Sequence, residues 1–463
     1  MPFAGKQKHG LPDSKLRGPH AGADDCTDGF EYAMSIRDTD CEKSMSRYSA
    51  FAVLKNALTG NKDWTPAWRK AEPKPAYDVV IVGGGGHGLS TAFYLASVHG
   101  IRNVAVVEKG WLGSGNVGRN TTIVRSNYRL PFNSDFYAKS MELWRELSHT
   151  LNYNVMFSPR GVLNLAHDPG QMDAYAERGN QMRLNGIKAE LLDRDQVAKL
   201  NPGLDVSASS RFPIEGGLLQ PDAGTARHDA VAWGYARAAD RLGVDIIENA
   251  EVTGFLKEGD SVVGVQTSRG DIRAQKVGVA VAGSTGRVMK MAGVDKLPIE
   301  STVLQAFVTE SIKPILPTVT TFGAGHLYVS QSDKGGLVFG GNIDYYNSYA
   351  QRGNLPVWEE VISELLAMFP NFARLRLLRS WGGVMDMSMD GSPVITTGPL
   401  PGMFLNCGWC YGGFKATPAS GWCFAHTIAN DKPHALNEPF TLKRFKDGRP
   451  IDELGAGPTP WYH

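Results

Sequence analysis

A glycine-rich turn in residues 78–96, DVVIVGGGGHGLSTAFYLA, has the residue types needed to bind the phosphates of a nucleotide. Only one register fits the pattern G-x-G-x-x-G, with Gly83, Gly85 and Gly88, because a register one residue later would need glycine at Leu89. In such a turn the first glycine permits the tight bend and the second lets the backbone approach a pyrophosphate. The third lets helix and strand pack closely. The pyrophosphate would then lie at the positive end of a helix.

The elements around this turn favour a dinucleotide site. Val79 to Val82 form an apolar run that is typical of a buried parallel strand, and a helical pattern begins at His87. A second apolar strand, NVAVVEK, ends in Glu108, 20 residues after Gly88, where an acid can bind a ribose hydroxyl. The alternative is a glycine turn in some other strand-to-helix junction. Strand, single register, helix and acid together favour the dinucleotide, but they do not distinguish NAD from FAD.

Two later stretches favour FAD. Residues 270–286 predict strands that end near Gly283, and residues 389–422 predict a strand, a glycine loop with Gly412 and Gly413, and a helix. Flavoproteins of the glutathione-reductase type build the FAD domain from separated pieces of chain like these, whereas a simple NAD domain is continuous. The predicted fold class is therefore α/β, with a doubly wound, Rossmann-like FAD-binding domain made of discontinuous segments and a mixed-sheet substrate domain.

The overall composition argues against several other classes of protein. The 463 residues carry 48 Lys and Arg against 47 Asp and Glu, so the net charge of +1 predicts neither nucleic acid nor an anionic membrane as a partner. No apolar run is long enough for a transmembrane span.

The cysteines are few and irregularly spaced: Cys26, Cys41, Cys407, Cys410 and Cys423. This usage fits a reducing compartment and predicts a cytoplasmic protein. The C-x-x-C of Cys407 and Cys410 could be a redox pair or half of a zinc site. No second such pair or close histidine pair completes four ligands, so no metal site is predicted.

The chain divides into five predicted parts. The polar start lacks the apolar segment of a secretory signal and predicts a disordered extension. The parts are a disordered extension at 1–45, a helical lead-in and linker at 46–76, an FAD-binding domain at 77–154, 215–296 and 385–430, a substrate domain at 155–214 and 297–384, and a C-terminal tail at 431–463.

Four stretches carry a family resemblance: VIVGGGGHGLSTA, EKGWLGSGNVGRNTTIVRSNY, RHDAVAWG and CGWCYGGFKATP. From residue 47 onward the chain resembles the D-amino-acid-oxidase-like flavoproteins, and among them the β subunits of heterotetrameric sarcosine oxidase. The resemblance implies oxidation of the N-methyl group of sarcosine at a noncovalent FAD. It further implies a covalently attached FMN where O2 is reduced to H2O2, and transfer of the methylene unit to tetrahydrofolate or its loss as formaldehyde. Heterologous α, γ and δ subunits are the implied partners.

The resemblance also implies two cations that bind the substrate carboxylate. Arg125 in TTIVRSNY and Lys415 in GGFKATP match this role, and a carboxylate bound by two cations forms short, strong hydrogen bonds. The alternative is that both are solvated surface cations. No general base stands out in the sequence. The chemistry can proceed without one, since desolvation in the pocket can itself favour the neutral amine.

The histidine that carries the covalent FMN in the family matches His228 in ARHDAVAW. Without the resemblance, a surface or capping role in the first turn of a helix would be the simpler interpretation, and His167 is interpreted as structural. The residues expected to bind the flavins are Gly83, Gly85, Gly86, His87, Gly88, Glu108, Lys109, Arg119, Asn120, Thr121, His228, Gly283, Gly412, Gly413, Phe414 and Lys415.

Two alternatives to sarcosine oxidation remain open at this point. One is a related enzyme for another amino acid such as dimethylglycine, N-methylglutamate or proline. The other is a flavin-binding regulatory subunit without turnover, against which the presence of Arg125, His228 and Lys415 argues.

Overall fold

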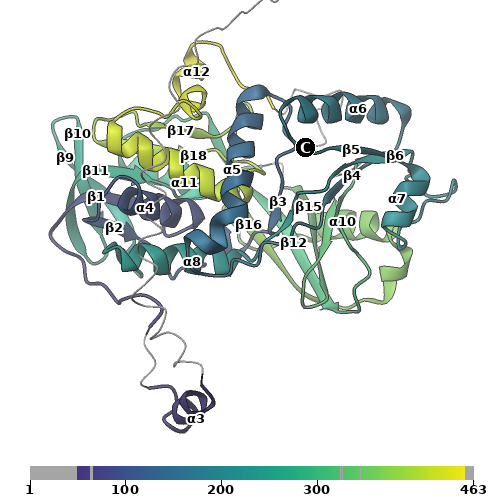
Figure 1. The fold of residues 1–463 in the computed structure, drawn as a ribbon. Coiled ribbons are helices and arrows are strands. Elements are labelled where there is room, and N and C mark those ends of the chain that lie inside the picture. Colours follow the sequence, from purple (N-terminus) through teal and green to yellow (C-terminus); the bar gives the residue numbers. More distant parts are fainter. Residues whose placement is uncertain (1–48, 63–65, 324, 326, 345, 454–463) are drawn as a thin grey trace, which may run out of the picture. The chain divides into compact units, whose positions relative to one another are not determined.

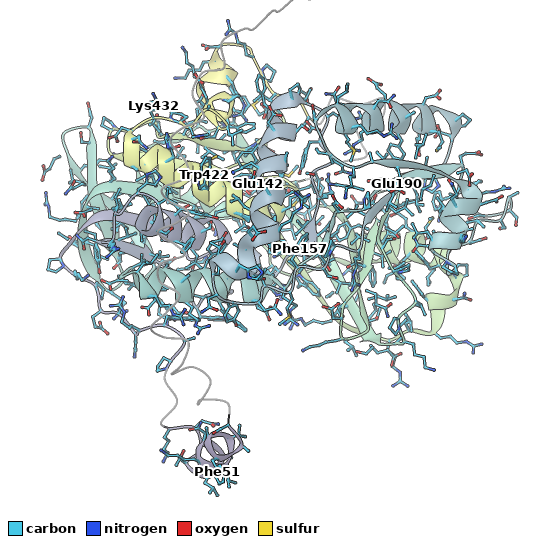
Figure 2. The ribbon with its side chains drawn as sticks, in the orientation of Figure 1. Phe51, Glu142, Phe157, Glu190, Trp422 and Lys432 are labelled. Carbon is cyan, nitrogen blue, oxygen red and sulfur yellow. The ribbon has the colours of Figure 1, made fainter. Side chains whose placement is uncertain are left out.

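The computed structural model describes residues 49–62, 66–323, 325, 327–344 and 346–453 (Figure 1). The chain forms two units, divided after Trp64, and each is described by itself. In the first unit α3 (Ala50–Leu58) begins at Ser49, whose side chain accepts a hydrogen bond from the Ala52 amide at 3.1 Å. None of its residues is buried, and Phe51 (Figure 2) is 84% exposed. The predicted extension at 1–45 lies outside the described residues.

The second unit contains two large sheets (Figure 1). The first has eight strands within the described residues, and its central β1 pairs in parallel with β11 on one side and β2 on the other. Its main path is β17 (Val394–Thr397), β18 (Met403–Cys407), β11 (Gly270–Val279), β1 (Ala76–Val82), β2 (Val104–Val107) and β8 (Asp245–Ile247), with β10 (Ser261–Thr267) on β11 and β9 (Val252–Glu258) on β10. Strands from three distant parts of the sequence thus form one sheet, which confirms the predicted discontinuous α/β fold.

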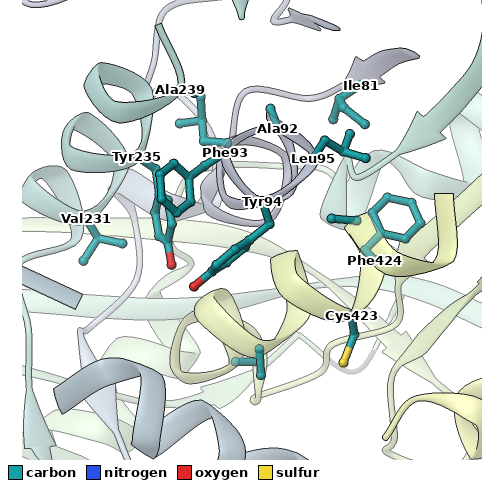
Figure 3. Packing of buried hydrophobic residues seen from close by; sticks show 14 of the residues in the cluster. Ile81, Ala92, Phe93, Tyr94, Leu95, Val231, Tyr235, Ala239, Cys423 and Phe424 are labelled. Carbon is teal, nitrogen blue, oxygen red and sulfur yellow. The ribbon is translucent and has the colours of Figure 1, made fainter. Parts of the chain in front are cut away.

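Alternate residues of β1 enter two different cores, as the two-residue period of a strand requires. Val79 and Ile81 pack against three helices, α4 (Gly86–Ser97), α8 (His228–Arg241) and α11 (Gly413–Asn430), whereas Val80 and Val82 face the β9–β10 hairpin and α9 (Thr285–Met291). Figure 3 shows the helical core, where Phe93 and Tyr94 of α4 lie beside Tyr235 of α8. The apolar run predicted from 79 to 82 is therefore a central strand buried on both faces.

The second sheet also has eight strands among the described residues. Its order is β16 (Leu377–Ser388), β12 (Ile299–Ser311), β15 (Gly336–Ile343), β14 (Tyr328–Gln331), β13 (Val319–Thr321), β4 (Val162–Ala166), β6 (Gly216–Gln220) and β5 (Glu190–Asp193). Helix α10 (Leu355–Met368) packs Val361 and Leu365 into its core. One strand differs from the predicted division, because Gly216–Gln220 pairs with β4 and β5 here rather than joining the FAD-binding part.

The remaining elements connect and cover these two sheets. They are η3 (Asn116–Gly118), β3 (Ile123–Val124), α5 (Pro131–Thr150), α6 (Pro169–Leu184), α7 (Arg194–Leu200), β7 (Gly224–Thr225), η4 (Ala282–Ser284), η5 (Pro370–Arg374), η6 (Glu438–Phe440) and α12 (Lys443–Lys446). In α12 the buried Arg444 binds Asp390 through two hydrogen bonds of 2.7 and 2.9 Å, which anchors the end of the described chain beside β16. None of the helices formed by the described residues combines the length and apolarity that a membrane crossing needs.

The two sheets approach each other where η4 meets β16. A Cβ atom at Gly283 would lie 2.3 Å from the Val384 carbonyl oxygen, so only glycine fits this close contact. The Asn116 side chain of η3 donates to the same carbonyl. These contacts place the ends of β1, β2 and β11 beside the second sheet.

Candidate cofactor and substrate site

A cavity of about 900 Å³ lies between the two sheets. Most of the residues predicted from the sequence line it: Gly83, Gly85, Gly86, His87, Glu108, Lys109, Arg119, Asn120, Thr121, Arg125, Gly283, Gly412, Gly413, Phe414 and Lys415. Gly88 and His228 are not among the lining residues.

The glycine turn has the geometry that its spacing predicts. Gly83 has a φ of +108°, and a Cβ atom there would lie 2.3 Å from the Ala280 carbonyl oxygen. A Cβ at Gly88 would lie 1.9 Å from the Gly83 carbonyl oxygen, so this glycine serves the packing of strand on helix. At Gly85 a Cβ would meet no described atom within 4 Å, and Gly85 borders the cavity. The open space at Gly85, directly before α4, suits a pyrophosphate at a helix N-terminus.

Glu108 is held in place by the same turn. Its carboxylate accepts hydrogen bonds from the backbone amides of Gly84 and Gly110, each at 2.9 Å. The Ser114 hydroxyl also donates to it, at 3.4 Å. An ionised carboxylate can accept about four hydrogen bonds, so it keeps capacity for a ribose hydroxyl.

His87 connects the glycine turn to the C-terminal glycine loop. Its ring stacks on Trp409 with centroids 4.6 Å apart, and its Nδ1 lies 2.7 Å from the Ser420 hydroxyl. Burial lowers the pKa of His87 to about 3, so the ring is neutral. His87 therefore brings packing and no charge to the cavity wall.

The loop at residues 114–122 is shaped by its own hydrogen bonds. The Arg119 guanidinium donates to the backbone carbonyls of Ser114 and Gly115, and the Arg119 carbonyl accepts from the Trp381 indole at 2.6 Å. The side-chain nitrogen of Asn120 donates to the Val117 carbonyl, and its side-chain oxygen accepts from the Thr122 backbone amide. The side chains of Arg119 and Asn120 were predicted to bind the flavin. In the structure they form hydrogen bonds within the loop and so stabilise the wall of the cavity.

Arg125 and Lys415 meet at the far end of the cavity. Lys415 in the first turn of α11 is only 6% exposed, and its Nζ donates to the Tyr411 carbonyl at 2.8 Å. Arg125 follows β3, and its guanidinium lies over the Tyr128 ring at 5.1 Å. Burial, and after it the Arg125 charge, hold the pKa of Lys415 well below its ordinary value. The two predicted cations are therefore close enough to repel each other in a largely dry site.

Two tyrosines that the sequence reasoning missed form the wall beside these cations. Tyr128 and Tyr137 are buried and stack with centroids 3.8 Å apart, and the Tyr137 hydroxyl donates to the Gly412 carbonyl at 3.3 Å. Tyr128 belongs to the quoted stretch TTIVRSNY, so its nearness to Arg125 was a usable signal. Tyr137 lies on α5 in no motif.

His228 does not line this cavity. It is the first residue of α8, and its Nδ1 is buried with no hydrogen-bond partner among the described residues. Burial lowers the pKa of His228. His167, in contrast, contacts backbone through both ring nitrogens, which agrees with the structural interpretation.

The cysteines that the structure describes are buried thiols. Cys410 has a φ of +49° and borders the cavity, and burial raises its pKa to about 12, so the reactive thiolate is disfavoured. In the described part of the chain, no three His, Cys, Asp or Glu side chains are placed to hold a metal ion. Cys26 and Cys41 lie outside it.

A cavity that begins at a glycine turn before a helix and ends at a buried lysine and a half-buried arginine defines a dinucleotide-dependent enzyme for small anionic substrates. The family model "FAD dependent oxidoreductase" matches residues 78–427, and the chain belongs to this family. FAD, rather than NAD, is therefore the cofactor, as the discontinuous segments predicted.

The similar proteins narrow the class. Sarcosine oxidase subunit beta of Rhizobium meliloti (strain 1021) is 61% identical over 417 residues, which cover 90% of this chain and all of that protein. The Arthrobacter protein of the same name is 52% identical, covering 84% of this chain and 96% of its own. The crystal structure of L-proline dehydrogenase from P. horikoshii has a TM-score of 0.76 at 27% identity, covering 81% of this chain and 99% of that one. Within the family, the chain belongs with the sarcosine oxidase β subunits.

Proposed function

We propose that this chain oxidises sarcosine with FAD as the β subunit of a multi-subunit oxidase. The observation that carries the proposal is the convergence of Arg125 and Lys415 at the end of a cavity that starts at the dinucleotide turn. The identity of 50–61% to three sarcosine oxidase β subunits supports sarcosine as the substrate.

The residues present fit FAD. The open space at Gly85 and the uncapped N-terminus of α4 would receive the pyrophosphate, and Glu108 would bind the ribose. The loops at Gly283 and at Gly412–Gly413 would border the rest of the cofactor. When bound, FAD supplies the two-electron oxidant for the carbon–nitrogen bond.

The protein's own contribution is to bind and orient the substrate. Arg125 and Lys415 would hold the carboxylate, and an anion between them removes the repulsion that depresses the Lys415 pKa. The same two positive charges and the burial favour the neutral, reactive form of the substrate amine. The stacked Tyr128 and Tyr137 exclude water from this end.

The complete reaction that we propose converts sarcosine, O2 and water to glycine, formaldehyde and H2O2. In the presence of tetrahydrofolate, the methylene unit passes to folate in place of free formaldehyde. Heterologous α, γ and δ subunits would complete the enzyme. The subunit names of the relatives support an assembly, and the finer points follow from the family resemblance.

We further propose that His228 carries a covalent FMN, which would supply the centre where O2 is reduced. The buried Nδ1 without a partner supports this, since an unpaired buried nitrogen is costly unless a group binds to it. Its position outside the FAD cavity suits a second, separate flavin.

Anaerobic titration of the purified chain, with FAD bound, tests the substrate. Sarcosine should bleach the FAD absorbance with one equivalent per FAD, and proline or dimethylglycine should do so at least about tenfold less efficiently. Acid precipitation of the complex with its partner subunits should leave yellow flavin on the wild-type chain and none on His228→Ala. Full reduction by proline but not sarcosine would overturn the substrate, and retained acid-stable flavin on His228→Ala would overturn the FMN site.

A further inference from the structure

The cavity is also lined by a second, half-buried guanidinium, that of Arg178 on α6. Arg178 donates through Nε to the Asn127 carbonyl at 2.8 Å and through Nη2 to the same oxygen. The side-chain oxygen of Asn127 accepts from Arg125, and its amide nitrogen donates to Asn164 at 2.9 Å. One asparagine thus fixes two guanidinium groups from different segments, and both line the same cavity.

Among the described residues, these two guanidinium groups have no directly bonded carboxylate. Within the described ranges, neither Arg125 nor Arg178 forms an ion pair with a carboxylate. The carboxylate of Glu453 borders the cavity, but it accepts hydrogen bonds from the Arg129 and Leu130 amides at 2.8 and 3.2 Å and from the Asn133 side chain.

The charge on Arg178 is correspondingly costly. Burial, followed by the charges of Arg125 and Arg129, lowers the pKa of Arg178 to about 10. A buried cation beside another cation is unfavourable unless an anion pairs with it. The Glu453 charge opposes this lowering of the pKa, but it ranks after burial and the two arginines as a cause. A single substrate carboxylate between Arg125 and Lys415 would leave Arg178 without a directly bonded anion.

We propose that Arg178 and Arg125 form a second carboxylate position, next to the one formed by Arg125 and Lys415. The chemical class that fits both is a secondary amine with two carboxylates, such as iminodiacetate. A monocarboxylate such as acetate or sarcosine would occupy the Arg125–Lys415 position alone. This proposal rests on the proposed function for the identity of the first position only.

Competition measurements on the FAD-loaded chain test the second position. The inhibition constants of iminodiacetate and of acetate are measured against the anaerobic reduction of FAD by sarcosine, in wild type, Arg178→Gln and Arg178→Lys. Arg178→Gln should weaken iminodiacetate by about tenfold or more, because charge-assisted bonds to its second carboxylate are lost. Acetate should be weakened much less than iminodiacetate, so that the ratio of the two inhibition constants changes, and Arg178→Lys should restore part of the iminodiacetate affinity.

Arg183→Gln, an exposed arginine on the same helix, is the matched control and should change neither ligand. Equal weakening of acetate and iminodiacetate in Arg178→Gln, or no weakening of either, would overturn the second position. If sarcosine fails to reduce the wild type, perturbation of the FAD spectrum by the two ligands replaces the kinetic readout. An Arg178-dependent preference for iminodiacetate would then support the second position although the proposed substrate had failed. Should Arg178→Gln not retain FAD, the comparison is made with Arg178→Lys, where the selective loss should be smaller but present.

Discussion

The two ends of the cavity differ in whether their charged side chains have partners within the protein. At the nucleotide end, the acidic Glu108, directly after β2, accepts hydrogen bonds from two nearby backbone amides, and close backbone contacts explain Gly83 and Gly88. At the substrate end, Arg125 and Lys415 come from separate segments and repel each other in a buried place. The first end is favourable before any ligand binds. The second holds unfavourable charge that a bound anion would relieve, so the chemistry is expected where the fold is least stable.

The largest expected effect comes from Lys415→Met, which removes a buried charge while keeping much of the side-chain volume. The rate constant for FAD reduction divided by the sarcosine dissociation constant should fall by about a thousandfold, because a charge-assisted bond and the substrate orientation are both lost. The thermal midpoint should rise, since the pKa of Lys415 is lowered and its charged form therefore destabilises the fold at neutral pH. Stopped-flow reduction and thermal unfolding measure the two quantities.

Lys188→Met is the control for this prediction, because Lys188 is exposed and pairs with Asp222 on the surface. Both quantities should stay near their wild-type values. A Lys415→Met variant that is less stable than wild type and still reduced by sarcosine would mean that the lysine is structural, and the contrast between the two ends would fail.

The nucleotide end should respond differently to substitution. Gly85→Ala adds a methyl group to the open space at the start of α4, so FAD should bind about tenfold to a hundredfold more weakly while the apoprotein keeps its thermal midpoint. Gly88→Ala must displace the Gly83 carbonyl and should lower the midpoint of the apoprotein itself. FAD titration and thermal unfolding separate the two. An unstable Gly85→Ala apoprotein would show that Gly85, like its neighbours, serves packing.

The contrast between the two ends also explains which site residues could be predicted from the sequence and which could not. Gly83, Gly88 and Glu108 belong to one continuous strand–helix–strand segment, β1–α4–β2 and the residue after it, so local spacing alone predicts their arrangement. Arg125 and Lys415 could be paired only through the family resemblance, because no local pattern relates them. Arg178 lies in an ordinary helical stretch and Tyr137 in another, so their convergence on the cavity depends on how the two sheets pack. The strand at 216–220 was assigned to the wrong sheet for the same reason, since its pairing with β4 and β5 is non-local.

The smallest expected effect concerns Asp386, which lies in the cavity wall between the two ends. Its buried carboxylate accepts a hydrogen bond of 2.5 Å from the amide of Gly408, the first residue of the loop that leads from β18 to α11. Burial raises the pKa of Asp386 from 3.8 to about 6. The charged form is therefore penalised in the folded state: the penalty is absent below pH ~4, grows as the pH rises, and is complete above pH ~6.

Asp386→Asn keeps an oxygen for the Gly408 amide and removes the charge. A shift of about two pKa units corresponds to on the order of 3 kcal/mol, or a few degrees in the midpoint of a chain of this size. We expect Asp386→Asn to raise the thermal midpoint of the FAD-loaded chain by about 2–4 °C at pH 8 and to leave it unchanged at pH 4, whereas the exposed control Asp271→Asn changes neither. A midpoint that falls at pH 8 would show that the ionised carboxylate is needed by the glycine loop. The unfavourable charge would then be confined to the cations at the substrate end. Asp386 would resemble Glu108 at the nucleotide end, as a carboxylate that the surrounding backbone amides stabilise.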